Sequence, residues 1–176
     1  MLCAEIDTEA AFNQLVERQG SLVYKLAYAR CGNQADAEDI FQQVFLRYLT
    51  KKPVFADLEH EKAWFIRVTV NRSKSLWSSA FRRHTQPLEG DLPTDTLAGH
   101  EELADLKDAL AQLPPDYRVL IHLFYYEGLP TAEIAQLLGK REGTVRMQLT
   151  RARRQLQDLL SEEKETTKGG ENKNEI

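Results

Sequence analysis

The stretch LPTAEIAQLLGKREGTVRMQLTRARRQL, residues 129–156, decides how the second half of this chain folds. Leu129–Pro130 predicts a turn, Thr131 is a good N-cap for a short helix, and Gly139 ends that helix. A longer helix follows, in which five apolar residues recur at helical spacing: Val145, Leu149, Ala152, Leu156 and Leu159. Two such helices, with the small Ala135 where they would cross, are typical of a helix-turn-helix.

The outer face of the longer helix carries most of the bases in this stretch. Side chains near its start would reach base edges in the major groove of DNA, and cations further along would suit phosphates. The first set is Arg141, Thr144, Arg146, Gln148 and Thr150, and the second is Arg151, Arg153 and Arg154. An ordinary helical hairpin with a basic, solvated face is the alternative that the sequence leaves open.

Upstream of this motif, residues 85–99 mark the expected domain boundary. The sequence TQPLEGDLPTDTLAG holds two prolines, two glycines and no periodicity, which indicates a flexible linker. Between linker and motif, one helix is predicted up to Pro114–Pro115 and a second from Pro115 to Gly128. The second domain is therefore expected at 100–160, and a polar, disordered tail at 161–176.

The first domain, residues 1–84, predicts three further helices. Apolar residues recur at helical spacing over about 9–31, 34–50 and 60–83. Gly32–Asn33 separates the first two helices, and Lys51–Lys52–Pro53 ends the second. Because no strand-like alternation persists, we expect an all-α fold of two small helical domains.

Residues 62–84 interleave aromatic side chains with six cations and contain no acid. Four polar side chains would lie along one stripe of a helix: Arg67, Asn71, Lys74 and Ser78. Such a surface suits unpaired DNA, because cations meet the backbone while aromatic or amide groups meet splayed bases. The alternative is that Trp64 and Phe65 are core residues and the cations are solvated.

Charge is distributed in blocks along the 176 residues, whose net charge is −4. Six bases lie in 62–84 and six in 137–160, whereas 85–136 hold ten acids and two bases. This order suggests two anion-binding surfaces on one chain. Two solvated helix faces are the alternative.

Several classes of protein are not expected. Two cysteines cannot form a disulfide framework, which favours the reducing cytoplasm, and neither a signal peptide nor a membrane span is recognisable. The four histidines are scattered, and no metal-ligand, nucleophile or phosphate-loop motif occurs. We therefore expect no enzyme, no cofactor or metal, and no small-molecule substrate.

Together these segments resemble the small extracytoplasmic-function (ECF) group of bacterial sigma-70 factors, over about residues 9–160. DAEDIFQQVFLRYL, 36–49, resembles the polymerase-binding helix of the family's region 2. AWFIRVTVNRSKSLWSSAFRR, 63–83, resembles its promoter-melting, −10-reading helix. LPPDYRVLIHLFYYEGLPTAEIAQLLGKREGTVRMQLTRARRQL, 113–156, resembles the −35-reading helix-turn-helix of region 4. The resemblance implies a dissociable initiation factor that directs core RNA polymerase to promoter DNA.

The resemblance also implies partners and site residues. Core polymerase would be contacted at its β′ clamp and β flap, the clamp through Asp39, Gln42 and Gln43. The −10 element would be bound by Lys62, Trp64, Arg67, Asn71, Arg72 and Lys74. The −35 element would be bound by Thr131, Arg141, Glu142, Thr144, Arg146, Met147, Thr150, Arg151 and Arg154. Residues 51–60 match the loop that selects a flipped-out −10 base, and an anti-sigma factor is an implied further partner.

Some positions depart from the family pattern. Gln43 stands where Glu is usual, Ser75 where Asp is common, and Ser78 where Arg is common. Arg141 replaces the usual capping Ser, which predicts the loss of a cap worth about 1 kcal/mol. Met147–Gln148 replace a commoner Ser–Arg pair, so the sequence does not predict the preferred promoter.

Two other functions fit the residues alone. A polymerase-independent helix-turn-helix regulator would bind duplex DNA by itself, usually as a dimer on palindromic half-sites. A helical adaptor that binds only protein would show no salt-dependent affinity for DNA. The basic–acidic–basic order of the chain argues against the adaptor.

Overall fold

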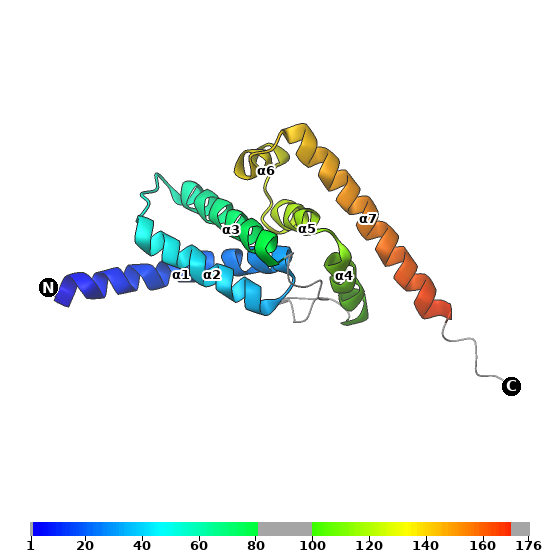
Figure 1. Ribbon diagram of the computed structural model, residues 1–176, viewed down its shortest axis with the longest axis horizontal. Helices are drawn as coiled ribbons and strands as arrows, with labels where there is room; N and C mark the ends of the chain where they lie inside the picture. The colour runs from blue at the N-terminus through cyan, green and yellow to red at the C-terminus, as the bar shows by residue number, and fades with distance from the viewer. Residues whose placement is uncertain (1, 81–99, 170–176) are drawn as a thin grey trace. The chain divides into compact units, whose positions relative to one another are not determined.

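All regular secondary structure in the described part of the chain is helical (Figure 1), which confirms the predicted all-α class. The computed structural model describes residues 2–80 and 100–169, with side chains over 9–75 and 105–161. The chain divides into two units, Met1–Gly90 and Asp91–Ile176. The predicted linker at 85–99 lies outside the described residues.

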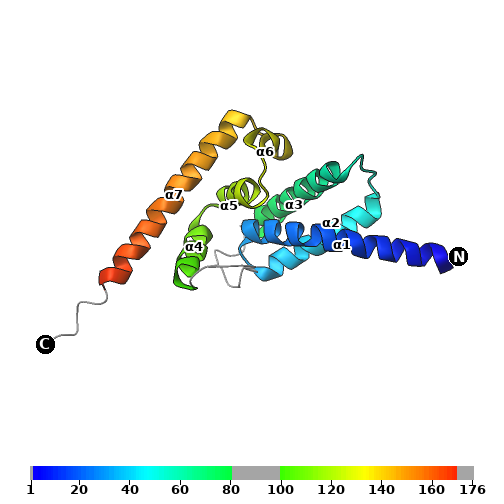
Figure 2. The ribbon, with the colours of Figure 1, turned by 180° about the vertical axis from the view of Figure 1, so that it is seen from behind.

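The first unit consists of α1 (Leu2–Cys31), α2 (Gln34–Lys51) and α3 (Leu58–Ala80). Each of these helices packs on the other two, and they lie side by side in both views (Figures 1 and 2). The core contains side chains that are fully buried: Val23, Leu26, Ala27, Ala37, Ile40, Val44 and Phe65. Each helix therefore contributes one apolar face and leaves the opposite face to solvent.

The break between α1 and α2 is fixed by two residues. Gly32 has a φ of 79°, a conformation that favours glycine. Asn33 is the N-cap of α2, and its Oδ1 accepts a hydrogen bond from the backbone N of Asp36 at 2.9 Å. The sequence predicted the break here, but not the asparagine cap.

The second unit consists of five helical elements. They are α4 (His100–Gln112), α5 (Pro115–Ile121), the π-helix η1 (His122–Tyr126), α6 (Thr131–Leu138) and α7 (Glu142–Gly169). Helices α4, α5 and α6 each contact α7. Val145, Leu149 and Ala152 of α7 are fully buried, as their spacing predicted.

Three elements differ from the prediction. Helix α1 begins at Leu2 rather than near residue 9. The helix expected to continue to Gly128 instead closes as a π-helix, in which the backbone N of Glu127 donates to the O of His122 at 3.1 Å. Helix α7 runs to Gly169, so the disordered tail does not hold for residues 161–169. The segment SEEKETTK, 161–168, has no glycine or proline and favours continuing the helix.

Candidate nucleic-acid and partner interfaces

The three predicted polymerase-binding residues lie on α2, away from its buried residues. Asp39 and Gln42 are exposed and Gln43 is half-buried. The Nε2 of Gln43 donates to Oδ2 of Asp39 at 2.7 Å, so these two side chains share one face, as their spacing of four predicted. Leu46, seven residues after Asp39, is also on the solvent side and is 64% exposed. Sequence reasoning missed Leu46, although the same helical spacing would have found it.

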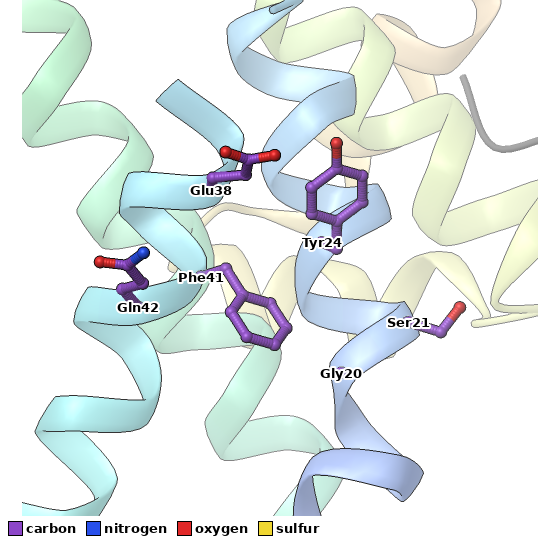
Figure 3. Close-up of a pocket in the computed structure, with 6 residues that line it drawn as sticks. All are labelled: Gly20, Ser21, Tyr24, Glu38, Phe41 and Gln42. Carbon is purple, nitrogen blue, oxygen red and sulfur yellow. The ribbon is translucent and has the colours of Figure 1, made fainter. Parts of the chain in front are cut away.

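A shallow groove lies beside this face, between α1 and α2 (Figure 3). Phe41 points between the two helices toward Gly20, and Tyr24 stands beside Glu38. Gln42 lines the edge of the groove. The α2 face is thus a polar helix surface next to an apolar depression, a combination suited to contact with another protein.

Three of the predicted −10 residues lie on the solvent face of α3. Arg67, Asn71 and Lys74 are exposed, whereas Lys62 and Arg72 are half-buried. The opposite face is buried, and it includes Phe65, Ile66, Thr69, Val70 and Ser73. The stripe drawn from the sequence is therefore a real surface as far as Lys74. Ser78, its last member, has no described side chain.

Trp64 lies in an aromatic cluster rather than alone on the surface. Its ring centroid is 5.9 Å from that of Phe55, 6.2 Å from that of Tyr48 and 5.0 Å from that of Phe65. Phe65 is fully buried, as the core alternative required, whereas Trp64 is half-buried. Trp64 therefore holds the loop that carries Phe55 against α2 and α3, and one part of its surface remains accessible.

The second unit contains the predicted helix-turn-helix, formed by α6 and α7. Gly139 adopts a left-handed φ of 64° and ends α6, and the backbone N of Lys140 donates to the O of Ala135 at 2.8 Å. Ala135 is 4% exposed, which fits the small residue expected where the helices cross. The outer face of α7 exposes Arg146, Met147, Thr150, Arg151 and Arg154, with Arg141 just before the helix and Thr144 half-buried.

The role predicted for Thr131 as an N-cap is wrong. Pro130 occupies that position, and Thr131 is the first residue of α6 with no side-chain cap bond. The Oγ1 of Thr131 instead donates to Oε1 of Glu142 at 2.8 Å, and Nη2 of Arg146 donates to the same oxygen at 2.6 Å. The Thr131 hydroxyl and then the Arg146 guanidinium hold the pKa of Glu142 below its usual value, because both stabilise the carboxylate.

Arg153 packs against aromatic rings and not beside the other two arginines predicted to reach phosphates. Its guanidinium lies 5.6 Å from the ring centroid of Phe124 and 6.0 Å from that of Tyr125. Both rings belong to η1, so this contact fixes the π-helix on α7. The sequence could not predict the contact, because it depends on where the π-helix places the rings.

Two further observations concern the described residues as a whole. No group of three or more His, Cys, Asp or Glu side chains within 9–75 and 105–161 is arranged to hold a metal ion. None of the described helices is long and apolar enough to cross a membrane.

Comparison with protein families gives two matches along the chain. Residues 15–83 match the model described as Sigma-70 region 2, and residues 103–156 match that of Sigma-70, region 4. Together these matches cover both units and include every predicted site residue.

Curated relatives match most of the length of this chain. The ECF RNA polymerase sigma factor SigE of Mycolicibacterium smegmatis is 33% identical over 166 residues, which are 89% of this chain and 64% of the relative. BldN of Streptomyces coelicolor, another ECF sigma factor, is 29% identical over 87% of this chain and 61% of its own length. SigL of Mycobacterium tuberculosis is 31% identical over 87% of this chain and 90% of its own. The chain thus spans a little over three fifths of the first two relatives.

Solved structures agree on the fold. The sigma factor RpoE in complex with the anti-sigma factor NepR from Bartonella quintana matches with a TM-score of 0.66 at 23% identity, over 86% of this chain and 97% of that one. CnrH in complex with the cytosolic domain of CnrY matches with a TM-score of 0.61 at 26% identity, over 87% and 89%.

Proposed function

The chain belongs to the sigma-70 family of RNA polymerase sigma factors, alongside their ECF members, and on that premise we propose that it directs core RNA polymerase to specific promoters. The observation that carries the proposal is the presence of regions 2 and 4, in this order, in one chain. Each region has a helix whose outer face carries exposed polar or cationic side chains.

The proposal assigns one task to each face. The α2 face with Asp39, Gln42 and Gln43 binds the β′ clamp, and the exposed Leu46 extends it. The α3 face with Lys62, Trp64, Arg67, Asn71, Arg72 and Lys74 binds the opened −10 element. The outer face of α7 binds the −35 element in duplex form, and the second unit contacts the β flap. The chain contributes binding energy, while the polymerase carries out the chemistry, so it is not an enzyme.

A protein inhibitor is a further proposed partner. RpoE and CnrH were each solved in complex with a partner protein, an anti-sigma factor in the case of RpoE. We propose that a cognate anti-sigma factor covers the polymerase-binding or DNA-binding faces of this chain. The proposed place of action is the cytoplasm, where polymerase and promoter DNA are found.

Run-off transcription tests the proposal directly. Purified protein and core polymerase are mixed with genomic fragments, including the one upstream of this protein's own gene. We expect discrete transcripts from the mixture and none from either component alone. Asp39→Arg is expected to lower transcript yield by about tenfold, because it reverses a charge in the clamp contact. Glu9→Arg, which reverses an exposed charge on the other helix, α1, is the matched control.

The strongest alternative, a polymerase-independent regulator, gives a different result. Such a protein would shift duplex DNA in a gel without polymerase, and Asp39→Arg would leave that shift unchanged. Sequence-specific, tight binding by the free protein with no transcript from the mixture would therefore replace the proposal.

A further inference from the structure

Three side chains of the helix-turn-helix meet at one carboxylate oxygen. Oε1 of Glu142 accepts from Oγ1 of Thr131 at 2.8 Å and from Nη2 of Arg146 at 2.6 Å. Thr131 begins α6, Glu142 begins α7, and Arg146 lies one turn further along α7. These two hydrogen bonds therefore connect the first residues of both helices to an arginine on the outer face of α7.

The geometry distinguishes Glu142 from a residue that simply contacts DNA. The side chain of Arg146 is 68% exposed and that of Glu142 is 38% exposed. An exposed pair at this spacing contributes little by itself, because two flexible side chains must be ordered to form it. Here the Thr131 hydroxyl already holds the Glu142 carboxylate. The Glu142 side chain therefore loses less conformational freedom when the Arg146 guanidinium bonds to it.

Arg146 can still bind DNA while it is held. A guanidinium carries five N–H donors in a fixed plane, and the bond to Glu142 uses Nη2. Its other edge remains able to make the paired hydrogen bonds that arginine makes to O6 and N7 of guanine. The start of a recognition helix is where such base contacts are made.

We propose that Glu142, held by Thr131, is a positioning residue that orients Arg146 toward a guanine and does not itself bind DNA. The proposal rests on the proposed function, because it takes the outer face of α7 as the −35 surface. It makes Thr131 and Glu142 determinants of specificity that act through Arg146.

Removal of the Glu142 carboxylate is predicted to change DNA affinity in the direction opposite to that expected from simple electrostatics. A carboxylate near phosphates repels them, so its removal should tighten binding to any DNA. If Glu142 positions Arg146, its removal weakens binding to the preferred sequence and lowers discrimination at one base pair. If Glu142 instead accepted from the amino group of a cytosine, its loss would act independently of Arg146.

A double-mutant cycle in the full chain tests these alternatives. The preferred duplex is first selected from a random pool by the assembled polymerase complex. If no promoter-specific transcript forms, the selection uses the free protein. That situation contradicts the proposed function but leaves the cycle measurable. Selection of no sequence by either form overturns both proposals.

The expected results are specific for each variant. Glu142→Gln and Thr131→Val each weaken binding to the selected duplex, Glu142→Gln by about fivefold to thirtyfold, whereas Thr131→Ser retains the hydroxyl and binds like the wild type. In an Arg146→Ala background, Glu142→Gln changes affinity less than about twofold. Asp158→Asn, which removes an exposed acid more than four turns beyond Glu142 on α7, does not weaken binding.

Three further measurements separate a loss of folding from a loss of positioning. Circular dichroism and thermal unfolding establish that each variant is folded, and the side-chain NMR signal of the Arg146 Nε reports its order in the free protein. That signal is expected to show greater mobility in Glu142→Gln and Thr131→Val than in Thr131→Ser. Tighter binding by Glu142→Gln, or equal losses with and without Arg146, would overturn the proposal.

Discussion

Glu61 is a buried carboxylate that joins two helices of the first unit. Its Oε1 accepts from Nε2 of Gln19 at 2.9 Å, and both residues are less than 9% exposed. Glu61→Ala leaves the Gln19 amide buried without this partner, so we expect a loss of about 1–3 kcal/mol in the free energy of unfolding. Urea titration measures the loss.

Arg18→Ala is the matched control for this prediction. Arg18 also reaches Glu61, at 3.3 Å, but its side chain is 44% exposed. An ion pair so accessible to water contributes about 0–1 kcal/mol. Equal losses for the two variants would show that the charge, and not the buried amide bond, connects α1 to α3.

The carboxyl of Glu142 gives the second unit a dependence on pH. Thr131 and Arg146 lower its pKa in the folded protein relative to the usual 4.5. The stabilisation is therefore complete above the unfolded-state pKa and is lost as pH falls through the folded-state pKa. We expect the urea stabilities of wild type and Glu142→Gln to differ at pH 7, and this difference to shrink as the pH falls through the folded-state pKa of Glu142. Carbon-13 NMR titration gives the pKa itself, and Thr131→Val should raise it.

At the scale of single elements, the end of α2 offers a stabilising substitution. Lys52 adopts a left-handed φ of 44°, which costs a side chain about 1 kcal/mol relative to glycine. Lys52→Gly is expected to raise the free energy of unfolding by about 0.5–1 kcal/mol. Lys51→Gly, one residue earlier and inside the helix, should lower it by a similar amount. Thermal unfolding of both variants tests whether Lys52→Gly raises stability while Lys51→Gly lowers it.

The helices themselves were largely predictable because their signals are local. Apolar spacing located the three helices of the first unit, and Pro115 and Gly139 marked a start and an end that the structure retains. What the sequence missed depends on tertiary contacts. The π-helix η1 carries rings that Arg153 packs against, and Thr131 bonds to a residue eleven positions away.

For the predicted site residues, too, the local property was predictable and the tertiary contacts were not. Exposure follows from helical spacing, so Asp39, Arg67 and Asn71 lie on the surface as expected. Which atoms they contact does not follow from spacing, because it depends on the rotamers and on neighbouring elements. The half-buried Trp64, packed on Phe55 from the loop, is an example.

At the scale of the whole molecule, each unit has a core built from its own residues. The chain divides into two units, and Ile40 and Leu149 are fully buried, one in each. Ile40→Ala and Leu149→Ala each remove about 2–5 kcal/mol from the unit that contains them. We expect each substitution in the full chain to raise hydrogen exchange in its own unit only. Exchange that rises in both units would show that they unfold as one.

Division into two units would also shape how the molecule binds DNA under the proposed function. The cations of α3 and those of α7 belong to different units, and acids predominate between the two blocks. A single small basic face binds DNA weakly at physiological salt, so specificity requires both faces to be engaged on one promoter. Under the proposed function, assembly with polymerase would provide that condition, because one partner would hold both units.

The salt dependence of promoter binding tests which arginines of α7 neutralise phosphates. If about six phosphates are contacted, the logarithm of affinity falls with the logarithm of salt with a slope of about −5. Arg151 and Arg154 are exposed on the outer face of α7, so Arg151→Ala and Arg154→Ala should each reduce the slope by about 1. Both should weaken binding to all sequences alike, as measured by fluorescence anisotropy with the assembled complex.

The control for these two variants is Arg153→Ala. It removes the same charge from a side chain that lies over Phe124 and Tyr125, so it should lower the free energy of unfolding and leave the salt slope unchanged. A slope that falls equally in all three variants would mean that net charge, rather than the placement of the cations on α7, determines how this helix binds DNA.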